Sequence, residues 1–218
     1  MARHPGPRPP RAAAPDLPGR FDEVSGLAPR TEVFAARLTG LSGDVAAAHT
    51  RLVETTAEEV SADRLDLTGA TLVDVRLGIA RLVELVGRDG SWRNVVVAGG
   101  RISTLDLQRA TLDGVEFVGV RIDYLGASAA TLQDVRFSDC GFGSVDLPGA
   151  TTTRVAFDGC RVDEFDTRDL RATDLDLRGL DALAFTDVRA LRGATLTPTQ
   201  LTLHAPSFAA ALGVDVRD

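Results

Sequence analysis

Apolar and small residues recur with a period of five along the chain, between about residue 45 and residue 192. Nearly every residue whose number is divisible by five belongs to this set, and so does nearly every residue two positions later. Ala70/Leu72 and Val135/Phe137 are examples. An amphipathic helix repeats at about 3.6 residues and a strand at about 2, so a period of five fits neither element. The pattern therefore predicts a repeat protein.

Each unit of five is predicted to form a short strand followed by a corner. Two apolar residues separated by one polar residue share a face of a strand. The next two positions are mostly small or polar, as in Thr68-Gly69 and Asp158-Gly159, and such residues favour turns. A longer pattern repeats every twenty residues, from Asp74–Leu77 to Asp174–Leu177, so four units make one turn. With strands about 4.8 Å apart, roughly seven turns predict a rod about 35 Å long.

The repeated unit resembles that of a known family. The unit Ala-(Asp/Asn)-Leu-X-X is seen most closely at residues 65–69, 70–74, 110–114 and 130–134, and it is similar to the repeat of the pentapeptide-repeat family. The resemblance covers about two-thirds of the chain. It implies an all-β solenoid, a right-handed quadrilateral β-helix. It does not by itself imply a function, because one fold supports many functions.

The chain divides by composition into four segments. Residues 1–19 are rich in proline and arginine and are predicted to be a disordered tail. Residues 20–44 are predicted to cap the first turn and cover its exposed strand edges. Residues 45–196 form the predicted β-helix, and residues 197–218 a helical C-terminal cap. The apolar contacts expected from the N-terminal cap are Val33, Phe34, Ala36, Leu38 and Leu41.

The C-terminal segment carries helix signals. Between Phe185 and Leu191 the repeat slips by one residue, and residues 194–196 make one last unit. Residues 197–200, Thr-Pro-Thr-Gln, match a capping box. Two short helices are predicted, over about 198–204 and 206–212, with Gly213 as the stop. Leu201, Leu203, Phe208 and Leu212 are expected to lie over the open end of the rod or to meet a second copy, so a homodimer is one expectation.

Several interior positions carry specific expectations. Phe117, Phe137 and Phe157 are twenty residues apart and should form a stacked interior column. Cys140 and Cys160 should stack in the same way, within reach of a disulfide but as free thiols in a reducing compartment. Trp92 follows Gly87 and Gly90, which replace two lattice residues. Two interpretations remain open there, a projecting bulge, which the glycines favour, and an indole lying across one end of the tube.

Charge gathers in outward columns. The formal net charge is −7, and without residues 1–19 the body keeps 21 basic and 30 acidic residues, or −9. Outward positions on one face give an acidic column, Asp66, Asp106, Asp146 and Asp166. The preceding face gives an arginine column, Arg81, Arg101, Arg121 and Arg161, and a third face gives hydroxyl residues, Thr71, Ser91, Thr111, Thr131 and Thr151.

No catalytic motif is visible. His4, His49 and His204 lie far apart in the predicted fold, and the chain contains neither a P-loop nor a GxGxxG motif. No catalytic, metal or cofactor site is predicted, and the chain is expected not to be an enzyme. No apolar run reaches 18 residues and the first residues lack a signal-peptide core, so a cytoplasmic protein without a membrane span is expected.

Two functions remain open at this stage. The first is an interaction module that binds an unidentified protein through the rod surface. The second follows from the resemblance: quinolone-resistance members of the family, of the Qnr and MfpA types, resemble B-DNA in width and negative surface and bind type II topoisomerases. That resemblance implies DNA gyrase as a partner, with Asp66, Asp106, Asp146 and Asp166 as the binding face. Direct nucleic-acid binding is not expected, and the arginine column argues against mimicry because duplex DNA is negative on all sides.

Overall fold

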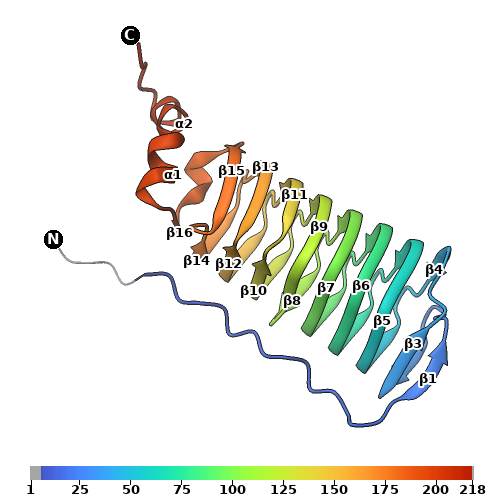
Figure 1. Ribbon diagram of the computed structural model, residues 1–218. Helices are drawn as coiled ribbons and strands as arrows, with labels where there is room; N and C mark the ends of the chain where they lie inside the picture. Colours follow the sequence, from blue (N-terminus) through green and yellow to red (C-terminus); the bar gives the residue numbers. More distant parts are fainter. Residues whose placement is uncertain (1–5, 218) are drawn as a thin grey trace.

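The computed structural model describes residues 6–217 and shows a right-handed quadrilateral β-helix of about eight turns, followed by two short helices (Figure 1). The predicted fold class is confirmed. The strands are β1 Asp22–Ser25, β2 Glu32–Phe34, β3 Ala36–Thr39, β4 Asp44–Ala46, β5 Arg51–Asp66, β6 Thr71–Val86, β7 Ser91–Asp106, β8 Thr111–Asp113, β9 Glu116–Gly126, β10 Thr131–Ser138, β11 Gly141–Asp146, β12 Thr151–Asp158, β13 Cys160–Asp166, β14 Arg171–Asp176, β15 Leu180–Phe185 and β16 Ala194–Thr195. The helical elements are the 3-10 turn η1 Val188–Leu191 and the helices α1 Pro198–Leu203 and α2 Ala205–Ala211.

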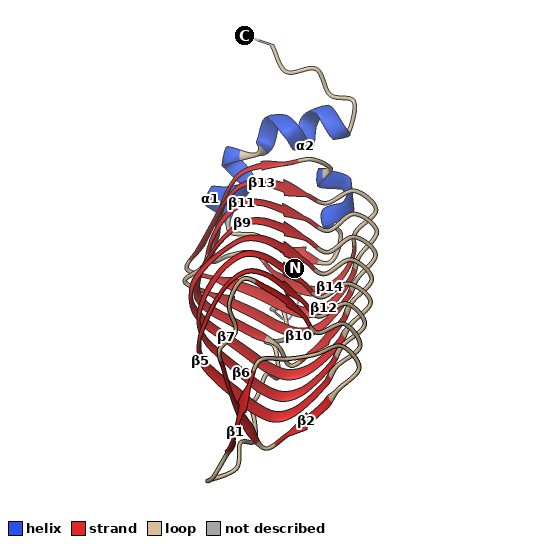
Figure 2. Ribbon diagram, turned by 90° about the vertical axis from the view of Figure 1, so that its right-hand side faces the viewer, coloured by secondary structure: helices blue, strands red, loops and turns tan. Residues whose placement is uncertain are grey.

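Successive coils pair as parallel strands with an offset of twenty residues. Leu72 lies beside Leu52 in one neighbouring coil and beside Trp92 in the other. Because the offset equals four repeats of five, equivalent residues of every coil stack along the axis. Figure 2 shows these coils lying over one another as a continuous tube. The twenty-residue period of the sequence is therefore the pitch of the solenoid.

The interior of the tube holds the lattice residues. The rings of Phe117 and Phe137 stack with centroids 5.1 Å apart, and those of Phe137 and Phe157 with centroids 4.7 Å apart. All three are buried. Stacked parallel strands place like side chains at nearly the strand spacing, which suits offset aromatic rings. The aromatic column thus fills the wide central part of the rod.

One corner of the coil is made by residues with left-handed backbone geometry. Asp74, Asn94 and Asp134 have φ values of 55°, 52° and 54° at equivalent positions. Asp and Asn tolerate this region better than other residues with a side chain. Asp or Asn is therefore frequent at this corner, although Glu54 and Arg154 adopt the same geometry with longer side chains. The residues of the corner form a column with a spacing of twenty residues.

Trp92 does not form a bulge, and that interpretation of the glycines was wrong. The indole is buried inside the tube, and the residues on both sides of it keep regular pairing with β6 and β8. A Cβ atom built on Gly87 would lie 2.8 Å from Cζ2 of Trp92, and one built on Gly90 would lie 3.2 Å from its Nε1. Both glycines point inward and leave room for the indole, so the coil stays closed.

Cys140 and Cys160 are buried free thiols on successive coils. The Cys140 thiol lies 3.4 Å from the carbonyl oxygen of Phe117, and the Cys160 thiol lies 3.4 Å from that of Phe137. The neighbouring Cys160 sulfur, together with burial, raises the pKa of the Cys140 thiol. A raised pKa keeps this thiol protonated and unreactive, which suits a residue that fills a small interior site.

The N-terminal segment continues the solenoid as irregular coils. β2 pairs with β5 at an offset of nineteen residues, Glu32 with Arg51, and β1 lies beside β3. Val33, Ala36, Leu38 and Leu41 are buried as expected, whereas Phe34 is 60% exposed. The expectation for Phe34 was wrong because adjacent residues of a strand point to opposite faces, and Val33 takes the inward position.

The C-terminal segment ends the tube with polar and aromatic contacts. The capping box of Thr197 and Gln200 is present at the start of α1. Gln200 also donates from Nε2 to the carbonyl oxygens of Leu177 and Leu180, at 2.7 and 2.6 Å. The His204 ring packs edge-on against Phe185. α2 starts at Ala205, one residue earlier than expected, because the first turn of a helix tolerates a proline at its second position.

Three of the four apolar residues expected over the open end of the rod face solvent instead. Leu201, Leu203 and Leu212 are exposed, and only Phe208 of that group packs against the core. Gln200, His204 and Phe208, which follow one another at intervals of one helical turn, reach the last coil. For Leu201, Leu203 and Leu212 a position over the open end was wrong, because Gln200 satisfies carbonyl groups that an apolar side chain would leave unpaired. Contact of these leucines with a second copy stays a prediction.

Residues 6–20, which we call the strap, run along the outside of the rod from the C-terminal end to β1 (Figure 1). The sequence predicted disorder for residues 1–19, of which residues 1–5 lie outside the described part. The structure instead holds the strap against the body: the backbone N–H groups of Arg8, Arg11 and Asp16 donate to the side chains of Asp174, Asp134 and Asp74. The strap has no strand of its own.

Candidate interaction surfaces

The acidic column is one continuous row on the outer side of β5, β7, β11 and β13. The strand register passes from Asp66 through Val86, Asp106, Gly126 and Asp146 to Asp166. The four carboxylates therefore belong to the same face, as the repeat implied. Their exposure differs from the expectation, since Asp106 and Asp166 are each only 6% exposed. These two side chains point outward and are covered by their neighbours.

Each carboxylate of the acidic column accepts hydrogen bonds from a local donor. Asp66 accepts from the backbone N–H and the hydroxyl of Thr68, at 2.9 and 2.6 Å. Asp106 accepts from Nε of Arg88 at 2.6 Å, and Asp166 accepts from the backbone N–H and Nε of Arg168, both at 3.0 Å. Asp66 and Asp166 thus cap the turn that follows their strand, and Asp106 does so by accepting from the backbone N–H of Gln108 at 3.1 Å. The charges of Asp106 and Asp166 are each balanced by an arginine, which for Asp106 lies in the neighbouring coil.

These contacts lower the pKa of two of the carboxyl groups, those of Asp66 and Asp166. The hydrogen bond from Arg168 is the main reason that the pKa of Asp166 is lowered. For Asp66, burial acts to raise the pKa, but the hydrogen bonds from Thr68 and Arg64 outweigh it and the pKa is lowered. A charged form that is stabilised by a fixed donor stays ionised at neutral pH. The column is therefore a row of ion pairs and turn caps.

Tyr124 contacts the acidic column near its middle, at Asp146. Its hydroxyl donates to Oδ2 of Asp146 in the next coil at 2.9 Å. Burial, with the hydrogen bond to Asp146 second, raises the pKa of Tyr124 to about 12. A Cβ on Gly126 would lie 2.9 Å from Cε1 of the ring, so the missing side chain at this point of the column gives the ring its place. The sequence analysis did not find this contact, although a glycine in an otherwise acidic row was the available signal.

The arginine column lies on the neighbouring face and is also paired. Arg101 donates from Nη2 to Asp123 at 2.7 Å, and Arg121 donates from Nε to the same carboxylate at 3.1 Å. Asp123 thus balances two arginines of the column. Arg81 pairs with Glu59. No equivalent contact joins Asp163 to Arg161 among the described residues.

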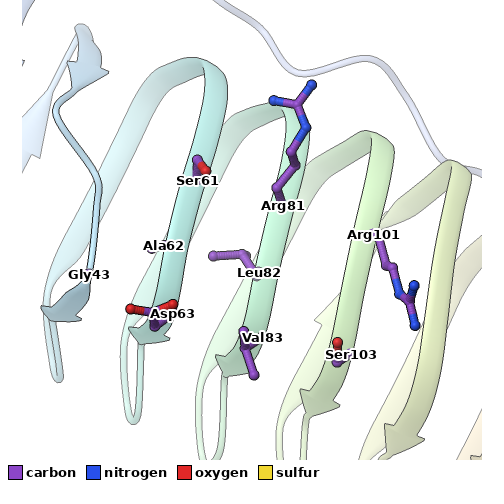
Figure 3. A pocket seen from close by; sticks show the side chains of 9 residues that line it. All are labelled: Gly43, Ser61, Ala62, Asp63, Arg81, Leu82, Val83, Arg101 and Ser103. Atoms are coloured by element: carbon purple, nitrogen blue, oxygen red, sulfur yellow. The ribbon is translucent and has the colours of Figure 1, made fainter.

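A hollow of about 390 Å³ lies on the arginine face near the N-terminal end (Figure 3). The small residues Gly43, Ser61 and Ser103 leave this part of the face open, while Arg81 and Arg101 stand on successive coils beside it. The two arginines beside it are already used in ion pairs with Glu59 and Asp123. The hollow is a feature of the surface and offers no converging set of free polar groups.

The hydroxyl column lies on a third face and is largely open to solvent. Thr111, Thr131 and Thr151 lie directly beside one another in β8, β10 and β12. All three are exposed. Threonine suits an exposed sheet surface because its branched side chain packs well against equivalent neighbours. This column supports the sheet and leaves a flat, polar face.

A second carboxylate column was missed by the sequence analysis. Asp74, Asp134 and Asp174 occupy equivalent corner positions and accept the backbone N–H groups of the strap, at 3.0, 2.9 and 3.2 Å. Asp134 also accepts two hydrogen bonds from Arg154, each 2.6 Å long. The hydrogen bonds from Arg154, with that from Arg11, lower the pKa of Asp134. The signal was present as acidic corners spaced by multiples of twenty beside an arginine-rich terminal segment.

Among residues 6–217, no group of three or more His, Cys, Asp or Glu side chains is placed to hold a metal ion. None of the helices described is long and apolar enough to cross a membrane.

Comparisons with known proteins add a structural likeness alone. No family model matches the chain, and no curated protein matches it. Among solved structures, the chain is similar to QnrB1, a plasmid-mediated fluoroquinolone resistance protein, with 15% sequence identity over 93% of this chain and 94% of that chain and a TM-score of 0.39. A likeness at this identity and TM-score carries no argument about function. The pentapeptide-repeat-like fold stands on the register and burial of the chain itself.

Proposed function

We propose that this chain is a member of the pentapeptide-repeat family and acts as a non-enzymatic interaction module, which binds a protein partner through the outer surface of its rod. The observation that carries the proposal is the fixing of outward charges in columns by contacts within and between coils. Arg88 with Asp106, Arg168 with Asp166 and Tyr124 with Asp146 are examples. Side chains that are already held in place lose little freedom when a partner binds.

The two neighbouring charged faces favour a partner with charges of both signs. The acidic column and the arginine column lie on adjacent faces of the same coils, so a protein lying over that edge meets both. Charge complementarity of this kind sets orientation and suppresses wrong partners. Asp66 and Asp146 are the partly exposed carboxylates of the predicted binding face. Arg88 covers Asp106 and Arg168 covers Asp166, so a partner contacts these arginines before it contacts either carboxylate.

The alternative is a DNA mimic that binds DNA gyrase and inhibits or protects it. The regular acidic column and the body charge of −9 favour it. Charge density disfavours it. The column from Asp66 to Asp166 spans five coil steps, about 24 Å, and holds four carboxylates. One strand of B-DNA carries about seven phosphate charges over the same length, at roughly one per 3.4 Å. Because these carboxylates are also paired locally, the general interaction module is the better account.

A supercoiling assay distinguishes the two functions. Purified chain is titrated into a DNA gyrase supercoiling reaction, with and without a quinolone and at two salt concentrations. A DNA mimic changes supercoiling or quinolone sensitivity, and its effect weakens with salt. The matched variant replaces Asp66, Asp106, Asp146 and Asp166 with Asn, which keeps the size of each side chain. We expect neither protein to alter gyrase; inhibition by the parent that is lost in the variant would establish the mimic instead.

The interaction module itself is tested by comparative capture. The intact chain and two folded variants, the fourfold Asp→Asn form and a form with Arg81, Arg101, Arg121 and Arg161 replaced by Gln, serve as baits. A protein held by the intact chain and released by one charge variant is then purified and its dissociation constant measured. If every captured protein binds all three baits equally, the charged columns are not the binding surface.

A second copy of the chain is a further candidate partner. Leu201, Leu203 and Leu212 form exposed apolar positions on α1 and just after α2. Deleting residues 197–218 would also remove the hydrogen bonds of Gln200 and open the end of the sheet, which favours aggregation. The double variant Leu201→Asp/Leu203→Asp keeps the cap, so sedimentation of this variant isolates the dimer. A dimer in the parent and a monomer in the variant support self-association, and a parent that is monomeric at all concentrations excludes it.

A further inference from the structure

The strap contacts one column of carboxylates on the rod at three points. Its backbone N–H groups at Arg8, Arg11 and Asp16 each donate to a carboxylate of one corner column. The acceptors, Asp174, Asp134 and Asp74, are separated by multiples of twenty residues and therefore lie on the same line along the axis. The strap therefore runs along the axis of the rod, across the coils, from the C-terminal end of the column toward its N-terminal end (Figure 1).

The spacing of the donors along the strap matches the spacing of their acceptors along the rod. From Arg8 to Arg11 the strap advances three residues, which in a polyproline II helix is about 9.3 Å. The acceptors of these two residues are two coils apart, about 9.6 Å. From Arg11 to Asp16 five residues give about 15.5 Å, against about 14.4 Å for three coils. An extended proline-type segment therefore presents one donor to a carboxylate after every second or third coil without strain.

The prolines of the strap prepare it for this geometry. Pro7, Pro9, Pro10, Pro15 and Pro18 are distributed along it. A proline fixes its own φ and keeps the preceding residue extended, so the free segment already resembles the bound one. A proline has no N–H, and the three residues that donate to carboxylates are all non-proline residues. Docking of such a segment costs little conformational entropy.

Side chains add charge and packing to the backbone contacts. Nε of Arg8 donates to Oδ2 of Asp174 at 2.7 Å. Pro9 and Pro10 border a hollow of about 400 Å³ on the surface of β12 and β14, beside Ala156 and Gly179. Pro10 is buried in this contact. The rod supplies a hollow lined by two small residues and by larger ones such as Phe157 where the prolines lie, and a carboxylate where the arginine lies.

Two of the three carboxylates of this column are held in place without the strap. Asp134 is fixed by two hydrogen bonds from Arg154, and Asp74 accepts one from the amide of Asn94 at 3.1 Å. The remaining carboxylate, Asp174, makes its hydrogen bonds with Arg8 alone among the described residues. Two of the three acceptors are thus pre-organised by the solenoid, as in a preformed peptide-binding surface.

We propose that this surface, the column of Asp74, Asp134 and Asp174 with the adjoining faces of β12 and β14, is a docking site for extended proline- and arginine-rich segments of other proteins. The strap occupies it in cis and competes with them. The inference rests on the proposed function in one respect, that the rod surface binds protein, and it names the chemistry of one partner segment. A partner segment binds when it displaces the strap, so the strap sets the threshold for binding.

Tethering makes the strap an effective competitor. A ligand on a short linker has an effective concentration on the order of 1 mM. A strap with an intrinsic dissociation constant of about 0.1 mM then weakens binding of the same sequence in trans by roughly tenfold. A weaker strap competes less, so the ratio of the two affinities measures the strap.

The test uses a synthetic peptide of residues 6–20 with a fluorescent label, titrated with the body, residues 21–218, and with the full chain. All strands, and all residues of the hydrophobic core, lie within the body, so it retains its core without the strap. Circular dichroism checks its fold. We expect the peptide to bind the body and to bind the full chain at least about tenfold more weakly. A peptide of the same composition in scrambled order is expected not to bind.

Two further variants locate the contact. Asp174→Asn in the body should weaken peptide binding, whereas Asp163→Asn, an exposed carboxylate on another face, should not. In the full chain, Arg8→Glu with Arg11→Glu should release the strap and give peptide affinity close to that of the body, without any deletion. This second route keeps the proposal testable if the truncated body proves poorly soluble.

Four outcomes would overturn the proposal. The first is no binding of the peptide to a folded body up to about 1 mM, and the second is equal affinity of the peptide for the body and the full chain. The third is binding of the scrambled peptide as tightly as the parent peptide. The fourth is a full-length dimer that becomes monomeric when residues 1–20 are removed. The last outcome would show that the strap binds a second copy. The experiment uses only the peptide and purified forms of this chain, so its failure is separate from a failure of the capture experiment, which reports on the charged columns.

Discussion

The phenylalanine column inside the rod and the acidic column outside it follow the same twenty-residue period, yet they behave differently. Phe117, Phe137 and Phe157 share one environment, because they stack on one another in the apolar interior of three successive coils. Asp106 and Asp146 do not: one is covered by Arg88 and the other is contacted by Tyr124. The comparison teaches that the repeat fixes where a side chain points. Only non-repeating neighbours decide what an outward side chain does.

The largest effect is expected inside the rod. Phe137→Ala removes the central ring of the stack and leaves a cavity between Phe117 and Phe157, so it should destabilise the protein by about 3 to 5 kcal/mol. Denaturant unfolding followed by circular dichroism measures the change. The matched control is Phe34→Ala, an exposed phenylalanine, which should change stability by less than about 0.5 kcal/mol. Equal losses from both substitutions would contradict the interior column.

A smaller loss is expected where the interior departs from its own repeat. Gly87→Ala places a Cβ 2.8 Å from Trp92 and 2.9 Å from Leu107. Overpacking of this kind should cost about 1 to 3 kcal/mol. A double-mutant cycle with Trp92→Leu provides the check, because the smaller leucine makes room for the new methyl group. If Gly87→Ala costs as much in the Trp92→Leu background, the glycine does not serve to admit the indole.

A loss on the order of 1 kcal/mol is expected on the acidic column. Asp166→Asn removes the ion pair with Arg168 but keeps an oxygen that accepts from the backbone N–H of Arg168. Because hydrogen bonding to Arg168 lowers the pKa of Asp166, its contribution is present above the ordinary carboxyl pKa and is lost as pH falls through the lowered value. The difference in unfolding free energy between parent and variant should therefore be full at pH 7 and shrink below about pH 4. A difference that does not depend on pH would mean that the charge of Asp166 contributes nothing; Asp169→Asn in the same turn is the control.

The smallest effect is spectroscopic. Tyr124 is the single tyrosine of the chain, so its titration is read directly from ultraviolet absorbance. Burial and the hydrogen bond to Asp146 raise its pKa to about 12. The associated stability is complete below about pH 10 and is lost as pH rises through the raised value. Asp146→Asn should lower the midpoint toward the ordinary value while burial keeps it raised. An unchanged midpoint in that variant would show that Tyr124 does not contact Asp146.

Much of the fold was readable in the sequence because the repeat carries it. The inward lattice, the twenty-residue pitch, the stacked phenylalanines, the slip before Ala194 and the capping box at Thr197 all depend on local patterns. In a solenoid each coil contacts only its neighbours, so a local pattern that repeats is also the tertiary structure. The positions of the four acidic-column residues followed for the same reason.

The errors arose where the repeat is broken or where a charge meets a distant residue. Gly87 and Gly90 were interpreted as a bulge because a sequence does not show that a large indole fills the space they leave. Leu201 and Leu203 were expected to cover the rod because hydrophobicity alone cannot reveal that two carbonyl groups of the last coil need a donor, which Gln200 provides. Neither pattern recurs, so neither could be inferred from its copies.

The sequence by itself determined the period, the inward face of every coil and the line along which each outward residue lies. The tertiary structure decided which of those outward residues are balanced, which are open and where the strap lies. The physical reason is distance along the chain: the period acts between residues twenty apart, whereas Arg8 and Asp174 are brought together from opposite ends of the chain. Such a contact depends on the whole length of the rod, which no single repeat encodes.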